Sequence, residues 1–205
     1  MKTENLQEWV GKTEERNDLL TSFPANAMAA TLNHEQLDYT ENKSLPPLWH
    51  WLYFLPIFKL SEAGYDGHAA LGDFLPPVQL PRRMWAGSRM EFFSPLQVGR
   101  EYKKTSKIKS VTAKSGSSGD LVFVTVSHEV SNGPAVCINE EHDIVYREKA
   151  TNSAVATKLV EAPKDFDFSI DINPDPVLLF RYSALTFNGH RIHYDYPFCT
   201  ETEGY

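Results

Sequence analysis

The densest group of polar side chains lies in residues 181–195, whose sequence is RYSALTFNGHRIHYD. His193 is suited to general acid/base work because the ordinary pKa of histidine lies near neutrality. Asn188 precedes it across a turn that contains glycine, and its uncharged amide could bind a water or a hydroxyl group. The run therefore predicts a proton-transfer site in which His193 moves the proton and Asn188 orients the reacting oxygen.

Two other interpretations of this run remain open. A turn rich in histidine can equally be a hydrogen-bonded structural element. His190 and His193 also have the i, i+3 spacing of a metal-binding pair. Such pairs rarely bind zinc without a third ligand nearby, so zinc is the weaker hypothesis.

Basic residues outside the run are candidates for binding an anionic substrate. Arg82 and Arg83 stand where a strand is expected to begin, as phosphate contacts or as solvated surface. His68 lies in a glycine-rich loop, where it either lines a substrate channel or holds the loop together. Three lysines share one face of an expected strand, and they either contact phosphates or protect a sheet edge: Lys103, Lys107 and Lys109.

The elements that must position these residues follow from periodicity. Residues 4–33 alternate polar and apolar side chains at helical spacing, and Pro24 fits the first turn of a second helix capped by Thr21 or Ser22. From residue 83 the period changes to two, which predicts an antiparallel meander and hence an α+β fold. The strands are expected over 84–93, 101–111, 121–130 and 135–146.

The remainder of the chain is expected to carry the polar run at a helix end. Residues 149–164 are polar and rich in small residues, as in a linker. A short strand is expected over 167–172, and an apolar helix over 177–187, with a proline in its first turn. This helix leads directly into the histidine-containing run.

Composition excludes several function classes. The 205 residues are 41% hydrophobic and 23% charged, with a net charge of −7, which argues against a nucleic-acid binder. Cys137 and Cys199 share no motif, and no apolar run approaches the roughly 20 residues of a membrane span. Without a signal or transit pattern at the N-terminus, we expect an intracellular protein of the cytoplasm or mitochondrial matrix. No motif indicates a cofactor or a nucleophilic serine or cysteine.

The run around His193 resembles the signature of the MaoC-like, R-specific enoyl-thioester hydratases, Gly-Asp-x-Asn-Pro-aliphatic-His. His193 matches the catalytic histidine and Ile192 the aliphatic position, while Asn188 stands where the family usually has its catalytic aspartate. Three further positions depart from the pattern: Phe187 for glycine, His190 for asparagine and Arg191 for proline. This form resembles the subgroup of hydroxyacyl-thioester dehydratase type 2 and mesaconyl-CoA hydratases.

The N-terminal part of the chain resembles the same subgroup. Its Gly67-His68 pair, FLPP at 74–77 and LPRRMWAG at 80–87 look like a fatty-acid-synthase-like dehydratase domain. The resemblance implies a hot-dog fold, with a long helix wrapped by an antiparallel sheet. It divides the chain into a first hot-dog (1–150), a linker (151–165) and the opening segment of a second, MaoC-like hot-dog (166–205).

The resemblance also implies the chemistry. The reaction is addition of water to a trans-2-enoyl thioester of coenzyme A or an acyl carrier protein, or its reverse, with Asn188 and His193 catalytic. Arg191, Arg83 and His68 are then expected to bind substrate, and a homodimer is expected because hot-dog domains work in pairs. The family's oxyanion donor lies at the start of a helix after the motif, about where this chain ends, so the apparatus within 205 residues is expected to be incomplete. A non-catalytic thioester-binding module and a hot-dog thioesterase are the alternatives.

Overall fold

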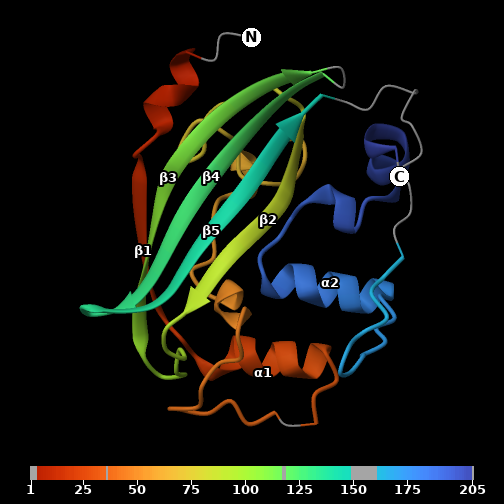
Figure 1. The fold of residues 1–205 in the computed structure, drawn as a ribbon. Helices are drawn as coiled ribbons and strands as arrows, with labels where there is room; N and C mark the ends of the chain where they lie inside the picture. Colours follow the sequence, from red (N-terminus) through yellow and green to blue (C-terminus); the bar gives the residue numbers. More distant parts are fainter. Residues whose placement is uncertain (1–3, 36, 117–118, 149–160, 205) are drawn as a thin grey trace.

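The centre of the molecule is a five-stranded antiparallel sheet, seen in a computed structural model that describes residues 4–35, 37–116, 119–148 and 161–204. The strands lie in the order β1-β3-β4-β5-β2, and Figure 1 shows them curving together as one sheet. Their bounds are β1 (Thr13–Leu19), β2 (Arg82–Phe92), β3 (Glu101–Gly116), β4 (Gly119–Asn132) and β5 (Ala135–Arg147).

The four strands expected from period-two alternation are confirmed; the structure extends the last three, and the first runs from Arg82 to Phe92 rather than over 84–93. In β4, Val122, Val124 and Val126 are buried in a core cluster, while Thr125 faces the opposite side of the sheet. Successive side chains of a strand point to opposite faces, which is why this alternation identifies a half-buried strand. β3, β4 and β5 form the expected meander, because each of these strands is hydrogen-bonded antiparallel to the next one along the chain.

The helix expected over 4–33 is wrong for its middle part. Residues Glu4–Trp9 form a short 3-10 turn and Thr13–Leu19 form the edge strand β1, paired with β3. The alternating burial of this strand is carried by polar residues, so its period-two pattern contains almost no hydrophobic signal. Pairing with β3, including an ion pair from Lys103 to Glu15 at 3.0 Å, decides its conformation.

The second helix expected in this region is confirmed as α1 (Ser22–Thr31), but it is not the long helix that the resemblance implies. It spans ten residues, and its Thr21 N-cap makes no side-chain capping hydrogen bond. Ala25, Met28 and Ala29 are buried. Tyr53 and Phe54, from the loop that follows the helix, belong to the same core cluster as Ala25 and Met28. Trp49 is partly buried and packs against the same core cluster.

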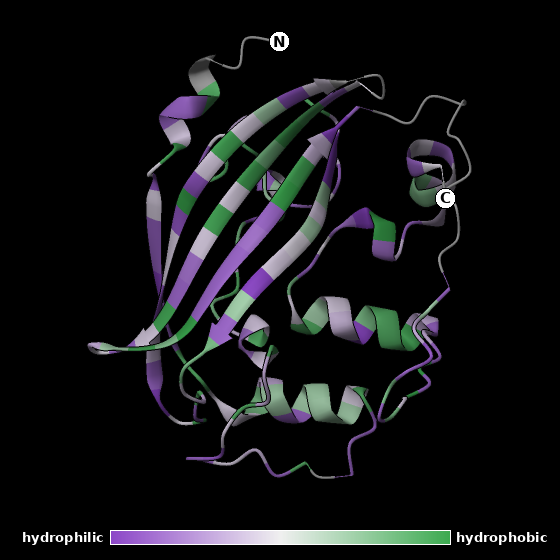
Figure 2. Ribbon diagram, viewed as in Figure 1, coloured by the Kyte–Doolittle hydropathy of each residue, from purple (hydrophilic) through white to green (hydrophobic). Residues whose placement is uncertain are grey.

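The helix expected over 177–187 is confirmed as α2 (Pro176–Leu185), with its proline at the first position. Asp175 is the N-cap, and its Oδ1 accepts a hydrogen bond from the backbone N–H of Leu178 at 2.8 Å. α2 contacts α1, and Leu185 packs against the α1 core cluster. Figures 1 and 2 show the two helices side by side, both largely apolar.

Replacing Asp175 with alanine should lower the free energy of unfolding by about 1 kcal/mol, the usual effect of losing an N-cap side chain. The carboxylate is lost as acceptor for the Leu178 N–H, which is left to water. Urea denaturation followed by circular dichroism measures the change. Asp171→Ala is the matched control, because Asp171 lies in the exposed segment before the helix and caps none. Equal losses in the two variants would show that the cap contributes nothing.

The strand expected over 167–172 is wrong. These residues have no regular secondary structure, and Phe168 and Ile170 are 79% and 75% exposed. Their alternation is that of a strand, but no sheet edge of the described residues pairs with them. The expected linker lies mostly outside the described residues, and residues 161–164 are exposed.

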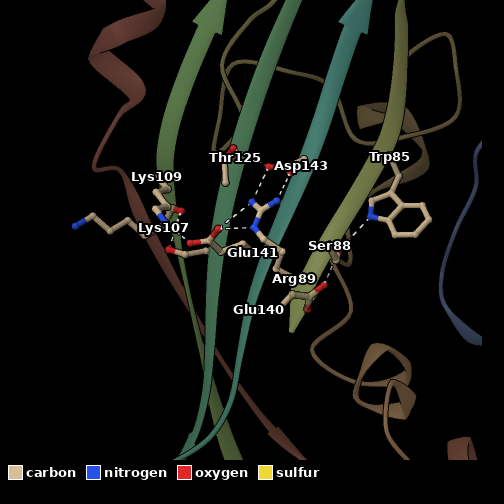
Figure 3. A network of polar contacts seen from close by, with 10 residues as sticks. Trp85, Ser88, Arg89, Lys107, Lys109, Thr125, Glu140, Glu141 and Asp143 are labelled. Carbon is tan, nitrogen blue, oxygen red and sulfur yellow. Dashed lines mark hydrogen bonds and ion pairs between the residues drawn. The ribbon is translucent and has the colours of Figure 1, made fainter. Parts of the chain in front are cut away.

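The outer face of the sheet carries a network of ion pairs, shown in Figure 3. Arg89 on β2 reaches Asp143 at 2.7 Å and Glu141 at 2.8 Å, and Lys109 also pairs with Glu141. The edge-protecting role considered for the lysines of β3 is wrong for Lys103 and Lys107, because β1 pairs with β3 over residues 101–107. Within the described part of the chain, no helix has the length and apolar character that crossing a membrane requires.

Candidate active site

The histidine-containing run folds back from α2 onto the loop that contains His68. The backbone N–H of Arg191 donates to the carbonyl of Asp66 at 2.9 Å, and its guanidinium donates to the carbonyl of Tyr65 at 3.1 Å. The backbones of Gly67 and Gly189 pass so closely that a Cβ at either position would overlap the other's carbonyl. Two segments more than a hundred residues apart are thus held together by direct backbone contact.

Four side chains meet at this junction, and we call them the junction cluster: Asp66, His68, Arg83 and His190. The Nδ1 of His68 lies 3.0 Å from Asp66 Oδ2, and an Nη2 of Arg83 lies 3.4 Å from the same oxygen. The rings of His68 and His190 lie with centroids 4.4 Å apart. The carboxylate therefore orients both a histidine and an arginine towards the motif.

His193 stands at the end of the short 3-10 turn Arg191–His193, next to the junction cluster. Its ring lies 5.8 Å from the ring of His190, nearly perpendicular to it. Burial lowers the pKa of His193 and is also the main cause of the lowered pKa of His190, because a half-buried imidazole loses hydration when it is charged. Both rings are therefore held towards the neutral form, which can accept a proton.

Asn188 follows α2 through Phe187, which has a positive φ of 51°. Its backbone N–H donates to the carbonyl of Ser183 at 2.8 Å, and its Oδ1 accepts a hydrogen bond from the backbone N–H of His190 at 3.1 Å. The side-chain oxygen is thus used to shape the turn, as an Asx turn. The amide nitrogen remains the part of Asn188 that can orient a water, and it does so as a donor.

Arg191, expected to bind substrate, makes several contacts within the protein. Its Nε and Nη2 donate to Asp195 Oδ2 at 2.8 and 2.6 Å, and its guanidinium lies over the ring of Phe198 at 4.6 Å. These contacts lie within the motif's own segment, and the hydrogen bond to Tyr65 connects that segment to the loop that contains His68. A role for Arg191 in substrate binding stays a prediction.

The backbone that follows the motif forms a short helical turn. Phe198–Glu203 form a π-helical turn, η5, and Asp195 Oδ1 accepts the N–H of Phe198 at 3.0 Å. Arg82, weighed above as a phosphate contact, is buried and pairs with Glu203, Nε to Oε2, at 2.7 Å. This ion pair fixes η5 to the start of β2, and of the two arginines only Arg83 belongs to the junction cluster.

Asp66 is the residue of this junction that sequence reasoning did not single out. It stands two positions before His68, so the spacing offered a carboxylate partner for the histidine. The structure also supplies what the zinc interpretation lacked, because Asp66, His68 and His190 can place one ligand atom each within 4.8 Å of one another. Arg83 pairs with the same carboxylate, and its fixed positive charge opposes a metal cation there.

Comparison with known proteins identifies the family. Residues 48–205 match the family model of hydroxyacyl-thioester dehydratase type 2. The whole chain is 44% identical to the mesaconyl-C(4)-CoA hydratase of Chloroflexus aurantiacus and covers 73% of it. Over 92% of the chain it is 26% identical to the mitochondrial hydroxyacyl-thioester dehydratase type 2 of Schizosaccharomyces pombe, covering 71% of that protein.

Solved structures give the same architecture. HtdX of Mycobacterium tuberculosis aligns with 95% of this chain and 68% of its own, at a TM-score of 0.60 and 16% identity. A MaoC-like dehydratase from Phytophthora capsici aligns with all of this chain and 70% of its own, at a TM-score of 0.59 and 17% identity. The motif at His193, the family match and this shared architecture agree: the chain belongs to the hydroxyacyl-thioester dehydratase type 2 family of hot-dog hydratases and dehydratases.

Proposed function

We propose that this chain interconverts trans-2-enoyl thioesters and (3R)-3-hydroxyacyl thioesters by adding or removing water, with His193 and Asn188 as its catalytic residues. The observation that carries the proposal is the junction itself: the motif of the family is packed onto the N-terminal loop that contains His68, whose Asp66 pairs with Arg83 of β2. Family membership supports the reaction class.

In the hydration direction, the oxygen of water forms a bond to the β-carbon while one of its protons is taken by His193. The α-carbon, which carries the electron pair of the broken double bond, then receives a proton from the imidazolium. Asn188 donates a hydrogen bond to the water and holds it in line. Because burial disfavours the charged imidazole, His193 is neutral when the water arrives and returns its proton readily.

Substrate binding falls to basic residues of the junction and of the motif. Arg83 is 12% exposed at its side chain and shares Asp66 with His68, so both donors are oriented before substrate binds. We assign Arg83, His68 and Arg191 to the thioester and its carrier. The coenzyme A thioester named for the Chloroflexus aurantiacus relative supports an acyl-CoA, and an acyl carrier protein is the other possible carrier.

A thioesterase is the second candidate, and Asp66 is the observation that favours it. A hot-dog thioesterase needs a carboxylate beside the thioester, and Asp66 lies in the junction cluster. That carboxylate is already engaged within the protein, because both His68 and Arg83 contact its Oδ2. Hydration therefore remains the better-supported reaction.

One assay separates the candidates. The chain is incubated with a trans-2-enoyl-CoA, and the loss of the conjugated enoyl absorbance is followed in parallel with the release of free coenzyme A thiol. The hydratase removes the absorbance and releases no thiol, and chiral analysis finds the (3R)-3-hydroxyacyl product. Thiol release would establish a thioesterase. Binding of the thioester without either change would establish a non-catalytic module.

The pKa of His193 predicts the acidic side of the pH profile. Its neutral form accepts the proton of water, and burial lowers its pKa, so the active form persists at lower pH than for an ordinary histidine. We expect kcat/KM for hydration to fall to half its maximum at a pH below about 6.5, the ordinary histidine pKa. A profile of kcat/KM against pH tests this, and half-maximal activity above that value would contradict it.

The setting of this function is also a proposal. The Schizosaccharomyces pombe relative is mitochondrial by name, which supports the mitochondrial matrix, and the Chloroflexus aurantiacus relative supports the cytoplasm. We propose that residues 166–205 open a second hot-dog and that the protein forms homodimers. The exposed apolar side chains of α2 support this assembly, with Val177 and Phe180 at 57% and 72% exposure.

A further inference from the structure

Asp66 lies in the junction cluster and has no assigned part in hydration, yet it contacts all three residues assigned above to the thioester and its carrier. Its Oδ2 lies 3.0 Å from Nδ1 of His68 and 3.4 Å from Nη2 of Arg83. Its Oδ1 accepts the backbone N–H of His68 at 3.1 Å. Its backbone carbonyl accepts the N–H of Arg191 at 2.9 Å. The residues proposed to bind substrate are therefore held by one common partner.

The ion pair between Asp66 and Arg83 is largely shielded from water. Their side chains are 13% and 12% exposed, whereas the side chain of Arg89, which forms ion pairs on the outer face of the sheet, is 59% exposed. Charges that are little exposed are screened less, so this carboxylate holds its guanidinium more firmly than a surface partner would. The contact uses one nitrogen of a group with five N–H donors, so it does not exhaust the donors that a ligand can use.

The same carboxylate fixes the position of His68. One oxygen accepts the backbone N–H of the histidine and the other contacts its ring, so main chain and imidazole are both held by one side chain. Because Nδ1 is engaged in this way, Nε2 is the ring nitrogen that points away from Asp66. The ring lies 4.4 Å, centroid to centroid, from that of His190 in the motif segment. Asp66 thus sets where the imidazole of His68 lies relative to the motif.

We propose that Asp66 is a positioning residue for substrate binding, which acts through Arg83 and His68 and takes no part in proton transfer. The inference rests on the proposed function, which assigns those two residues to the thioester. The hydrogen bonds of the Asp66 side chain go to His68 and Arg83, whereas the chemical step is assigned to Asn188 and His193. Loss of the carboxylate should therefore weaken binding and leave the chemical step as it is.

Asp66→Asn is the test variant, because it keeps the shape of the side chain and the backbone hydrogen bond to Arg191. Its amide replaces one acceptor oxygen by a donor, so it cannot hold Arg83 and His68 as the carboxylate does. The Kd of butyryl-CoA, a saturated thioester with no double bond to hydrate, should rise about tenfold in calorimetric titration, as for one lost charged hydrogen bond. The KM of crotonyl-CoA should rise with it, and kcat should stay at the wild-type value.

Asp143→Asn is the matched control, because Asp143 also pairs with an arginine, Arg89 at 2.7 Å, on the outer face of the sheet (Figure 3). It should leave Kd, KM and kcat unchanged. Asp66→Glu keeps a carboxylate on a side chain one methylene longer, so its Kd should fall between those of the wild type and Asp66→Asn. In a chain that carries Arg83→Gln and His68→Gln, Asp66→Asn should weaken binding no further, because both groups through which it acts are gone.

Four results would overturn the role of Asp66. They are no binding of butyryl-CoA by the wild type, equal Kd in Asp66→Asn and Asp143→Asn, a full additional loss in the chain without Arg83 and His68, and a fall in kcat at constant KM, as for a base. If Asp66→Asn does not fold, Asp66→Glu decides, and it must raise Kd and KM at constant kcat. Failure of the proposed function is a separate result, absence of crotonyl-CoA hydration by the wild type, because the Kd comparison involves no turnover.

Discussion

His193→Gln should lower kcat for enoyl-thioester hydration by roughly a hundred- to ten-thousand-fold, the range for loss of a general acid/base group. Glutamine keeps the polar character of the position but cannot move a proton at neutral pH. The change in KM should be small, because the groups that we assign to substrate binding lie on other residues. Steady-state kinetics with a trans-2-enoyl-CoA measures both constants.

His34→Gln is the matched control for this substitution. His34 is an exposed histidine beside Trp49, remote in sequence from both segments of the junction, and the change should leave kcat as it is. If His193→Gln retains the wild-type kcat, another residue performs proton transfer. His190, whose ring lies 5.8 Å away, is then the next candidate.

Gly67→Ala should lower kcat/KM about a hundredfold, the scale of a 1 Å misplacement of catalytic groups. Gly67 has a φ of +88°, and an added Cβ would overlap the carbonyl of Gly189. Backbone cannot yield as a flexible side chain can, so the motif must separate from the loop that carries His68. Activity measured together with urea denaturation distinguishes displacement of the site from loss of the whole fold.

Gly11→Ala isolates the effect of that contact. Gly11 has almost the same φ, +90°, but nothing lies within 4 Å of an added Cβ. It should therefore cost only the strain of a left-handed alanine, about 1–2 kcal/mol, and leave kcat/KM unchanged. A Gly67→Ala enzyme as active as Gly11→Ala would show that the close contact with Gly189 does not position the site.

The parts of the fold that the sequence predicts are those whose apolar pattern is decided locally. β4 alternates valines with polar residues, and α2 has both a proline at its first position and an aspartate cap. β1 could not be predicted in this way, because TEERNDL has one apolar residue and its conformation depends on pairing with β3. For residues 167–172 the prediction was wrong in the opposite way. Their alternating pattern is that of a strand, but no sheet edge among the described residues pairs with them.

In the candidate site too, the residues of one local run could be predicted, and the contacts between distant segments could not. The motif residues Asn188 and His193 lie five positions apart in one short run, and the sequence alone identifies them. The approach of His190 to Asp66 could not be identified in this way, because it depends on the backbone contact between Gly67 and Gly189. A pattern of residue types does not report which distant loop a turn will touch.

Chemical rescue tests most directly whether His193 transfers the proton. His193→Ala leaves a space where the imidazole was, and added imidazole can enter it and act as the acid/base group. We predict that hydration of a trans-2-enoyl-CoA by this variant rises saturably with imidazole concentration, while the wild type does not respond. A variant that is as active as the wild type without imidazole would contradict the account.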